Sequence, residues 1–173
     1  MAQELKLITV LALITVLVSP SNVRGNDADH DPLFYIERNK NANIVQYDAR
    51  LGKDGLLHPK QPVVAYWIRH AERGQVEDLS WIQDKFAYGF KAKLNKSENT
   101  VILDMAVNIG RTIMVKRDGE DYRATTDING VTCYVDKIFI HASGKGMATR
   151  VDDIELFGTA VHNNTKQHEH LSP

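Results

Sequence analysis

The chain has 173 residues, of which 43% are hydrophobic, 25% charged and 8% aromatic. These proportions are ordinary for one globular domain and exclude a disordered, collagen-like or coiled-coil protein. There are 21 Lys and Arg residues against 22 Asp and Glu residues, so no basic surplus points to nucleic acid or an anionic membrane. The single cysteine, Cys133, excludes an internal disulfide.

The first segment is typical of a secretory signal peptide. Residues 7–18 form an unbroken apolar run, which is shorter than the roughly 20 residues that cross a bilayer. Cleavage after Gly25 or after Ser21 fits the small residues that follow Pro20. An uncleaved membrane anchor is the alternative, because Glu4 weakens the positive start. We expect an exported protein, periplasmic or secreted, with no stable membrane span after signal removal.

The rest of the chain shows no internal repeat and no second domain. We expect residues 1–25 to be the signal peptide, residues 26–160 to form a single β-rich domain, and residues 161–173 to be a frayed polar C-terminal tail. Without a disulfide, the domain must rely on its hydrophobic core for stability.

Alternation of apolar and polar residues predicts many short strands. The expected strands are residues 33–38, 44–47, 63–71, 101–105, 112–116, 122–126, 131–135, 137–141 and 153–157. Asp118-Gly119 and Asn129-Gly130 are strong hairpin signals, and the Asn-rich residues 39–43 indicate another hairpin. Residues 63–71 begin apolar on both faces, which favours a central strand. Cys133, between Val131 and Val135, is expected to be a small buried strand residue. The fold class is mainly β (α+β), an antiparallel β-sandwich or partly open barrel with one helix packed on it.

The one helix is expected within residues 79–88. Ser80 and Gln83 have the spacing of a capping box, in which each side chain satisfies a first-turn amide. Gly89 stands where a left-handed terminating residue is favoured. The apolar residues at helical spacing, which we expect to face the sheet, are Leu79, Ile82 and Phe86.

Several segments together resemble a bacterial family known only as domain of unknown function 4833. They are FYIERNKNAN at 34–43, VQYD at 45–48, Pro62 with YWIR at 66–69, LSWIQ at 79–83, KFAYG at 85–89, ING at 128–130, IFI at 138–140, and Val151 with IELFG at 154–158. The resemblance implies export in bacteria and a single small domain, and it implies no activity. His70 departs from the Tyr expected after Arg69, so the resemblance does not support a histidine-dependent role there.

One local motif suggests catalysis. Arg69-His70 at the end of an apolar strand resembles the signature of histidine phosphatases, in which the His attacks a phosphoryl group and the Arg neutralises phosphate charge. His141 imitates a second catalytic histidine. The context argues against this interpretation, because two strands precede the motif and hairpin-linked strands follow it. The candidate catalytic residues of this alternative are His70, Arg69 and His141.

Three histidines of the C-terminal tail are candidate metal ligands. His162, His168 and His170 lie in a segment expected to be mobile, which gives no second-shell hydrogen bonds to hold a metal. No Cys or His group has zinc spacing. We therefore predict no metal and no cofactor.

A cationic and aromatic region near the Asn-rich hairpin is the candidate binding site. An Arg side chain binds carboxylate or phosphate with two hydrogen bonds, and aromatic residues form apolar pockets. The alternatives are purely structural roles. The arginines would pair with Glu37, Glu72 or Asp48, and the aromatic rings would pack in the core. The candidate ligand-binding residues are Arg38, Asn41, Asn43, Trp67, Arg69 and Tyr88.

The sequence favours a non-catalytic module of the cell envelope that binds a small molecule or an envelope protein. This rests on the lack of an evident nucleophile–base pair, metal cluster or phosphate loop, and catalytic groups can still assemble in space. The alternatives are a phosphoryl-transfer hydrolase acting through Arg69-His70 and a structural subunit of an envelope complex. The latter would carry an exposed apolar patch.

Overall fold

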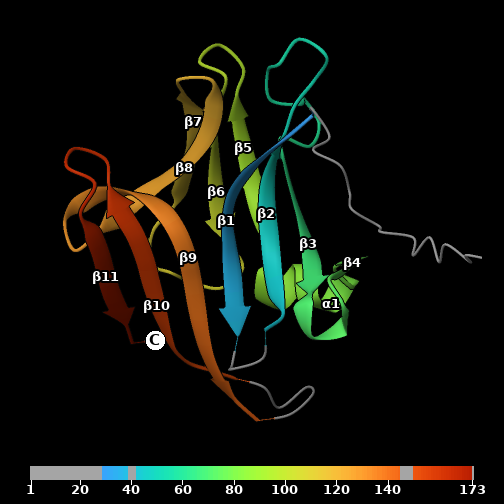
Figure 1. Ribbon diagram of the computed structural model, residues 1–173, viewed down its shortest axis with the longest axis vertical. Helices are drawn as coiled ribbons and strands as arrows, with labels where there is room; N and C mark the ends of the chain where they lie inside the picture. Colours follow the sequence, from blue (N-terminus) through green and yellow to red (C-terminus); the bar gives the residue numbers. More distant parts are fainter. Residues whose placement is uncertain (1–28, 39–41, 145–149, 173) are drawn as a thin grey trace, which may run out of the picture.

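The protein folds as one curled sheet. The computed structural model describes residues 29–38, 42–144 and 150–172. Strands make up 62% of it, and the sheet curls into a partly open half-barrel beside one short helical segment (Figure 1). This confirms the mainly β class and the partly open barrel expected from the sequence.

The described residues form eleven strands and one helical connection, with two short turns of other helical type. In chain order they are β1 (His30–Arg38), β2 (Ile44–Arg50), β3 (Val63–Arg69), η1 (His70–Glu72), β4 (Gln75–Asp78), α1 (Trp81–Gln83), η2 (Asp84–Tyr88), β5 (Phe90–Asn95), β6 (Thr100–Met105), β7 (Ile113–Asp118), β8 (Asp121–Ile128), β9 (Val131–Ser143), β10 (Arg150–Ala160) and β11 (Lys166–Leu171).

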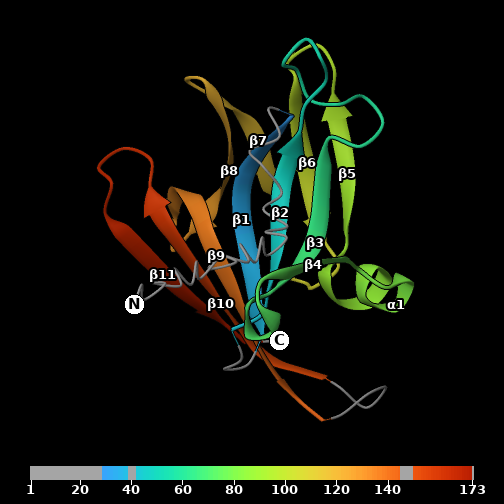
Figure 2. The ribbon, with the colours of Figure 1, turned by 45° about the vertical axis from the view of Figure 1, so that its right-hand side comes forward.

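The long strand β9 joins two branches of the sheet. The order is β4-β3-β2-β1-β9-β8-β7-β6-β5, with β10 and β11 continuing from the other edge of β9. Along the edge of β9 opposite to β10, residues as far as Tyr134 pair with β8, and residues from Lys137 onward pair with β1. Every neighbouring pair is antiparallel except β1 with β9. The sheet therefore forks at the point where β9 changes partner (Figure 2).

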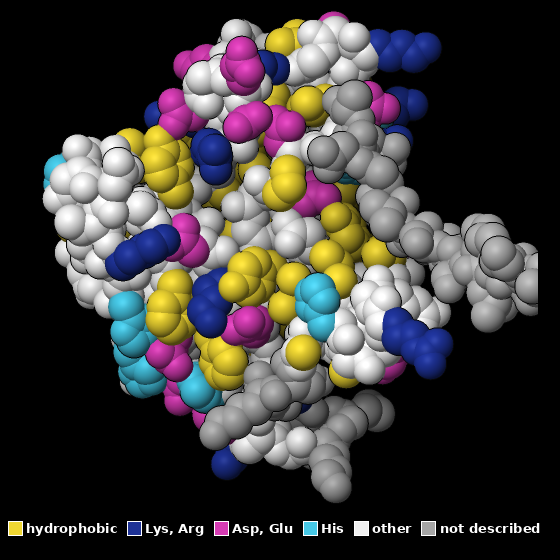
Figure 3. All heavy atoms as spheres, in the orientation of Figure 1, with side chains coloured by type: hydrophobic (Ala, Val, Ile, Leu, Met, Phe, Trp, Pro, Cys, Tyr) yellow, Lys and Arg dark blue, Asp and Glu magenta, His cyan; other side chains and the backbone are white. Residues whose placement is uncertain are grey.

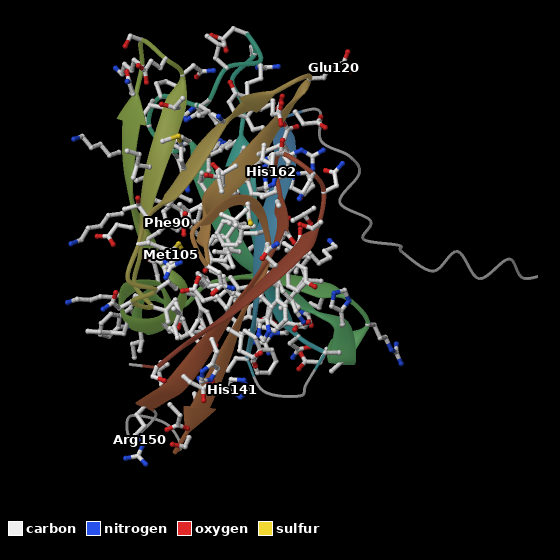
Figure 4. All side chains as sticks on the ribbon, turned by 90° about the vertical axis from the view of Figure 1, so that its left-hand side faces the viewer. Phe90, Met105, Glu120, His141, Arg150 and His162 are labelled. Carbon is white, nitrogen blue, oxygen red and sulfur yellow. The ribbon has the colours of Figure 1, made fainter. Side chains whose placement is uncertain are left out.

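The core lies between the two branches. The ring of Tyr47 on β2 stacks on Phe34 at 4.6 Å and reaches Phe90 on β5 at 6.0 Å between centroids. Figure 4 shows Phe90 and Met105 close together at the lower end of the β5–β6 pair. Cys133 is fully buried in this core, as the sequence predicted.

Turn residues behave as the sequence indicated. Asn129 and Gly130 both have positive φ, 52° and 78°, which is the conformation that matches the twist of a two-residue hairpin. Asp118 ends β7 and Gly119, with φ 66°, begins the reversal into β8. Strands β1 and β2 also pair antiparallel, as expected of the Asn-rich hairpin.

Three strand expectations were wrong. Residues 63–71 do not form a central strand, because β3 lies next to the edge strand β4 and most of it is only half-buried. The expected strands 131–135 and 137–141 are one strand, bulged at Asp136 where the register with β10 shifts. Residues 161–173 are not a frayed tail, because β11 pairs with β10 from Lys166 to Leu171.

The helical segment begins as predicted and packs differently. The Ser80–Gln83 capping box is present, with the Ser80 amide donating to Gln83 Oε1 at 3.0 Å. The side chains of Ile82 and Phe86 are 53% and 64% exposed, so they do not face the sheet. Tyr88, which is 3% exposed, is the buried residue on the side of the helical segment that faces the sheet.

Gly89 has a different role from the one expected. Its φ is −74°, so it is not a left-handed terminating residue. A Cβ at this position would lie 1.8 Å from the carbonyl oxygen of Asp84. Glycine is required here by close backbone approach at the end of η2.

Candidate functional site

The structure brings three of the predicted site residues together beside η2. The rings of Trp67 and Tyr88 meet edge to face, with centroids 5.1 Å apart. The Arg69 guanidinium lies over the Trp67 ring, 5.7 Å from its centre. Arg69 also donates from Nε to Glu77 at 2.7 Å and has Glu72 at 3.6 Å. The arginine is therefore engaged by carboxylates of its own chain.

Arg38 joins the same group from the end of β1. Burial raises the pKa of the Tyr88 phenol, and a hydrogen bond with Arg38 acts in the opposite direction. The Nε atom of Arg38 is buried and has no hydrogen-bond partner. Arg38, Tyr88, Trp67 and Arg69 thus form one contiguous row along the lower end of β1–β3.

The two candidate asparagines differ. Asn43 is only 8% exposed, and its Oδ1 accepts a hydrogen bond from the Ala71 amide at 3.1 Å. Its amide therefore fixes the turn after β3 and is not directed to solvent. Asn41 lies outside the described residues.

The residues of the phosphatase alternative are separated. His70 opens η1 directly after β3, whereas His141 lies on β9, with β2 and β1 between the two strands. Three inter-strand steps place them on the order of 14 Å apart. His141 Nε2 instead contacts Glu155 Oε1 at 2.5 Å. A single phosphoryl group cannot bridge both histidines at that separation.

A trough lies at the fork of the sheet. One cavity of about 290 Å³ is bounded by β1, β8 and β9, and a second of about 390 Å³ continues it toward the β7–β8 turn. Both are lined by Arg123, Tyr134 and Asp136, so they adjoin. The fork trough, as we call these two cavities, exists because β9 leaves β8 before it meets β1.

The lining of the fork trough combines both signs of charge with an apolar wall. Asp136 accepts from Lys166 Nζ at 2.8 Å and from Thr159 Oγ1 at 2.9 Å. The Tyr134 hydroxyl donates to Asp118, and this bond raises the pKa of the phenol. Arg123 contacts Asp121 only at 3.4 Å, with both side chains more than half exposed. The apolar wall comes from Pro32, Leu33 and Tyr35 on β1.

Histidines and carboxylates alternate on the face of β9–β11 that points away from the core. One carboxylate oxygen of Glu155 contacts His141 Nε2, and the other contacts His168 Nε2 at 2.6 Å. These contacts lower the pKa of Glu155, the His141 hydrogen bond most of all. His170 lies 3.2 Å from Asp153. Figure 3 shows the histidines gathered at the lower left, over β10 and β11.

This array does not have the arrangement of a metal site. Within residues 29–38, 42–144 and 150–172, no group of three or more His, Cys, Asp or Glu side chains is placed to hold a metal ion. His168 and His170 belong to β11, whereas His162 precedes it in the turn after β10. Figure 4 shows His162 far from His141 along the molecule.

Large apolar side chains point outward from the helical segment. Trp81 is 71% exposed, Phe86 64% and Ile82 53%. Lys85 lies among them, with Nζ 5.1 Å from the Phe86 ring centre. We call these four residues the outward helical face. Figure 2 shows the segment projecting from the body of the sheet.

Sequence reasoning missed both the fork trough and the outward helical face. Arg123, Tyr134 and Asp136 stand on two strands in ordinary alternation, and no local signal separates them from surface residues. Helical spacing identified Ile82 and Phe86 as one face. Spacing alone could not tell whether that face meets the sheet or the solvent.

These features define a small half-barrel domain with a forked sheet. A family model described as "Domain of unknown function (DUF4833)" matches residues 34–170. The chain therefore belongs to this family, as the resemblance indicated, and the match includes most of β11. No curated protein and no solved structure matches the chain. Among the described residues, no helix is long and apolar enough to span a membrane.

Proposed function

We propose that this protein is an exported, non-catalytic module of the cell envelope that binds a small, uncharged, hydroxyl-rich ligand, such as a sugar, in the fork trough. The observation that carries the proposal is the lining of the trough, where a guanidinium and carboxylates stand beside an apolar wall. Export and envelope location rest on the apolar run at residues 7–18.

The charges of the trough favour a neutral ligand. The lining carries a positive side chain, Arg123, and two negative ones, Asp118 and Asp136. An anion or a cation would therefore be attracted by one part of the lining and repelled by another. A hydroxyl group donates and accepts at once, and it can therefore bond to a guanidinium and a carboxylate that lie side by side. The less polar face of a sugar ring would rest on Tyr35 and Leu33.

The trough suits this role better than the row beside η2. There, Arg69 is paired with Glu77, and Asn43 is used by the Ala71 amide. Ligand binding at that row would have to break these contacts. At the trough, Arg123 pairs with Asp121 at 3.4 Å and both side chains are more than half exposed, so a ligand that bonds to Arg123 replaces a weaker contact.

The test is calorimetric titration of the purified protein with neutral di- to tetrasaccharides of glucose and of N-acetylglucosamine. We expect binding by at least one of them, and a loss of about tenfold in affinity, or about 1.4 kcal/mol, in Arg123→Ala. Arg150→Ala is the matched control, because Arg150 has an 81% exposed side chain at the far end of β10 (Figure 4).

Two results would contradict the proposal. One is the absence of heat from every saccharide at millimolar concentration while the protein remains folded. The other is equal loss of affinity in Arg123→Ala and Arg150→Ala, which would place the ligand elsewhere. Enzymatic turnover of any saccharide would contradict the claim that the protein is non-catalytic, but not the claim that it binds sugars.

A further inference from the structure

Gln46 lines the fork trough from β2, whereas Arg123 lines it from β8. Strands β1 and β9 lie between these two strands in the sheet (Figure 1). In the register of β1 with β2, Gln46 pairs with Tyr35, which is part of the apolar wall of the trough. The side-chain amide of Gln46 is therefore a polar group beside the surface on which a sugar ring would rest.

The orientation of the Gln46 amide is fixed by its own strand. Nε2 donates to Asp48 Oδ1 at 2.9 Å and to the Tyr47 carbonyl at 3.1 Å, so both N–H groups are used. Carboxylate and carbonyl oxygens accept hydrogen bonds and do not donate them. An amide turned the other way would set Oε1 against these two acceptors. Nε2 must therefore face Asp48, and Oε1 occupies the other arm of the amide.

The Asp48 carboxylate bonds to side chains and not to the backbone. Asp48 is 5% exposed, and a buried carboxylate is costly unless it is hydrogen-bonded. Among the described residues its oxygens accept only from Gln46 Nε2 and from the Tyr66 hydroxyl, at 2.5 Å. Asp48 therefore fixes no turn or strand end. Of its two partners, Gln46 is the one that lines the fork trough.

Gln46 Oε1 remains as an acceptor for a ligand. In the part of the chain that the structure describes, no group donates a hydrogen bond to it. An amide oxygen accepts up to two hydrogen bonds. The ligand must therefore supply the donor, which a sugar hydroxyl does and an ether oxygen does not.

We infer that Gln46 is a specificity-determining residue of the fork trough, whose Oε1 accepts a hydrogen bond from one hydroxyl of the bound saccharide. Asp48 is a positioning residue that holds the Gln46 amide in the orientation this requires. The inference rests on the proposed function and adds a requirement to it. One hydroxyl, at a defined position of the ligand, must be free to donate.

The first measurement needs no ligand. NMR relaxation of the side-chain amides should show Gln46 Nε2 to be almost as rigid as the backbone, with an order parameter close to about 0.85. Gln75, which is exposed on the edge strand β4, is the comparison and should lie below about 0.6. Asp48→Ala should make the Gln46 amide mobile. Asp48→Asn, which keeps an acceptor oxygen, should retain part of the rigidity.

The second measurement couples Gln46 to one hydroxyl of the ligand. The neutral saccharide that binds the wild type best is titrated beside its deoxyfluoro derivatives, in which fluorine replaces one hydroxyl and cannot donate. One of these replacements should lower the affinity of the wild type by about tenfold. Gln46→Met has a side chain of similar length without the acceptor. It should bind the parent saccharide about tenfold more weakly, and the same replacement should cause no further loss.

Two further variants separate positioning from general damage. Asp48→Asn should bind the parent saccharide with an affinity between those of the wild type and Gln46→Met. Gln75→Ala, the matched control, should bind it as the wild type does. Equal melting temperatures of Gln46→Met and the wild type would show that the loss of affinity does not come from unfolding.

Three results would overturn the inference. If Arg123→Ala weakens saccharide binding and Gln46→Met does not, this inference fails and the proposed function stands. If no saccharide binds the wild type, both fail. If the Gln46 amide is as mobile as that of Gln75 in the wild type, Asp48 does not position it.

Discussion

Arg111 and Glu169 form a two-pronged ion pair, with Nη1–Oε2 and Nη2–Oε1 distances of 2.7 and 2.8 Å. The two residues are 58 positions apart in the chain. Glu169 Oε2 also accepts from the Asn129 amide at 2.8 Å, so one carboxylate joins the segment before β7, the β8–β9 turn and β11. This pair explains why the polar C-terminal segment is an ordered strand.

Loss of the Glu169 carboxylate should destabilise the protein measurably. Its side chain is 17% exposed, and Glu169→Gln weakens three charge-assisted hydrogen bonds at once. We expect the free energy of unfolding, from urea denaturation, to fall by about 1–3 kcal/mol. Lys166→Ala, which breaks a pair with a 77% exposed lysine, should cost under about 1 kcal/mol. Equal losses would mean that the Glu169 pair is no stronger than a surface pair.

Acid should weaken the protein through Glu155. The hydrogen bond from His141 comes first among the causes that lower the pKa of this carboxyl below 4.5. A carboxyl with a lowered folded-state pKa adds stability above its unfolded pKa, and that stability is lost as the pH falls through the folded value. Glu155→Gln should therefore flatten the fall in melting temperature below about pH 4.5. An unchanged acid profile would contradict the role of this contact.

Asn43 should matter for stability through its side-chain oxygen. Asn43→Ala removes the buried acceptor that bonds the Ala71 amide at 3.1 Å, at a cost of about 1–2 kcal/mol. Asn43→Asp keeps the acceptor and should recover part of the loss in thermal unfolding. If Asn43 instead contacts a ligand, Asn43→Ala should change affinity while the melting temperature stays the same.

Gly89→Ala should be among the most damaging single substitutions. Its Cβ would be 1.8 Å from the Asp84 carbonyl oxygen, so η2 or β5 must move, at a cost of about 3 kcal/mol or more. Gly110→Ala is the comparison, because it meets nothing within 4 Å and bears only the penalty of a φ of +69°, about 1–2 kcal/mol. Equal melting temperatures of the Gly89→Ala and Gly110→Ala proteins would contradict the close approach of Gly89 to the Asp84 carbonyl.

The purified protein should not hydrolyse an aryl phosphate. His70 and His141 are held on the order of 14 Å apart by β2 and β1, and Arg69 is paired with Glu77. We expect no turnover above background in the wild type or in His70→Ala. Activity that disappears in His70→Ala would restore the phosphoryl-transfer alternative.

What the sequence determined by itself is local. Alternation located the main strands, and Asn129-Gly130 located a hairpin because both residues adopt positive φ readily. Ser80 and Gln83 marked the start of the helical segment because a capping box uses only neighbouring groups. Each of these signals depends on residues within about four positions of one another.

Tertiary structure decided everything that depends on a distant partner. β11 is a strand because it pairs with the edge of β10 and its Glu169 pairs with Arg111, although all its residues but Leu171 are polar. Trp81 and Phe86 face the solvent because Tyr88 takes the inner position against Tyr47. The fork trough exists because β8 and β1 share one edge of β9. Strand pairing and the choice of buried face are set by contacts between residues distant in the sequence, which local periodicity does not identify.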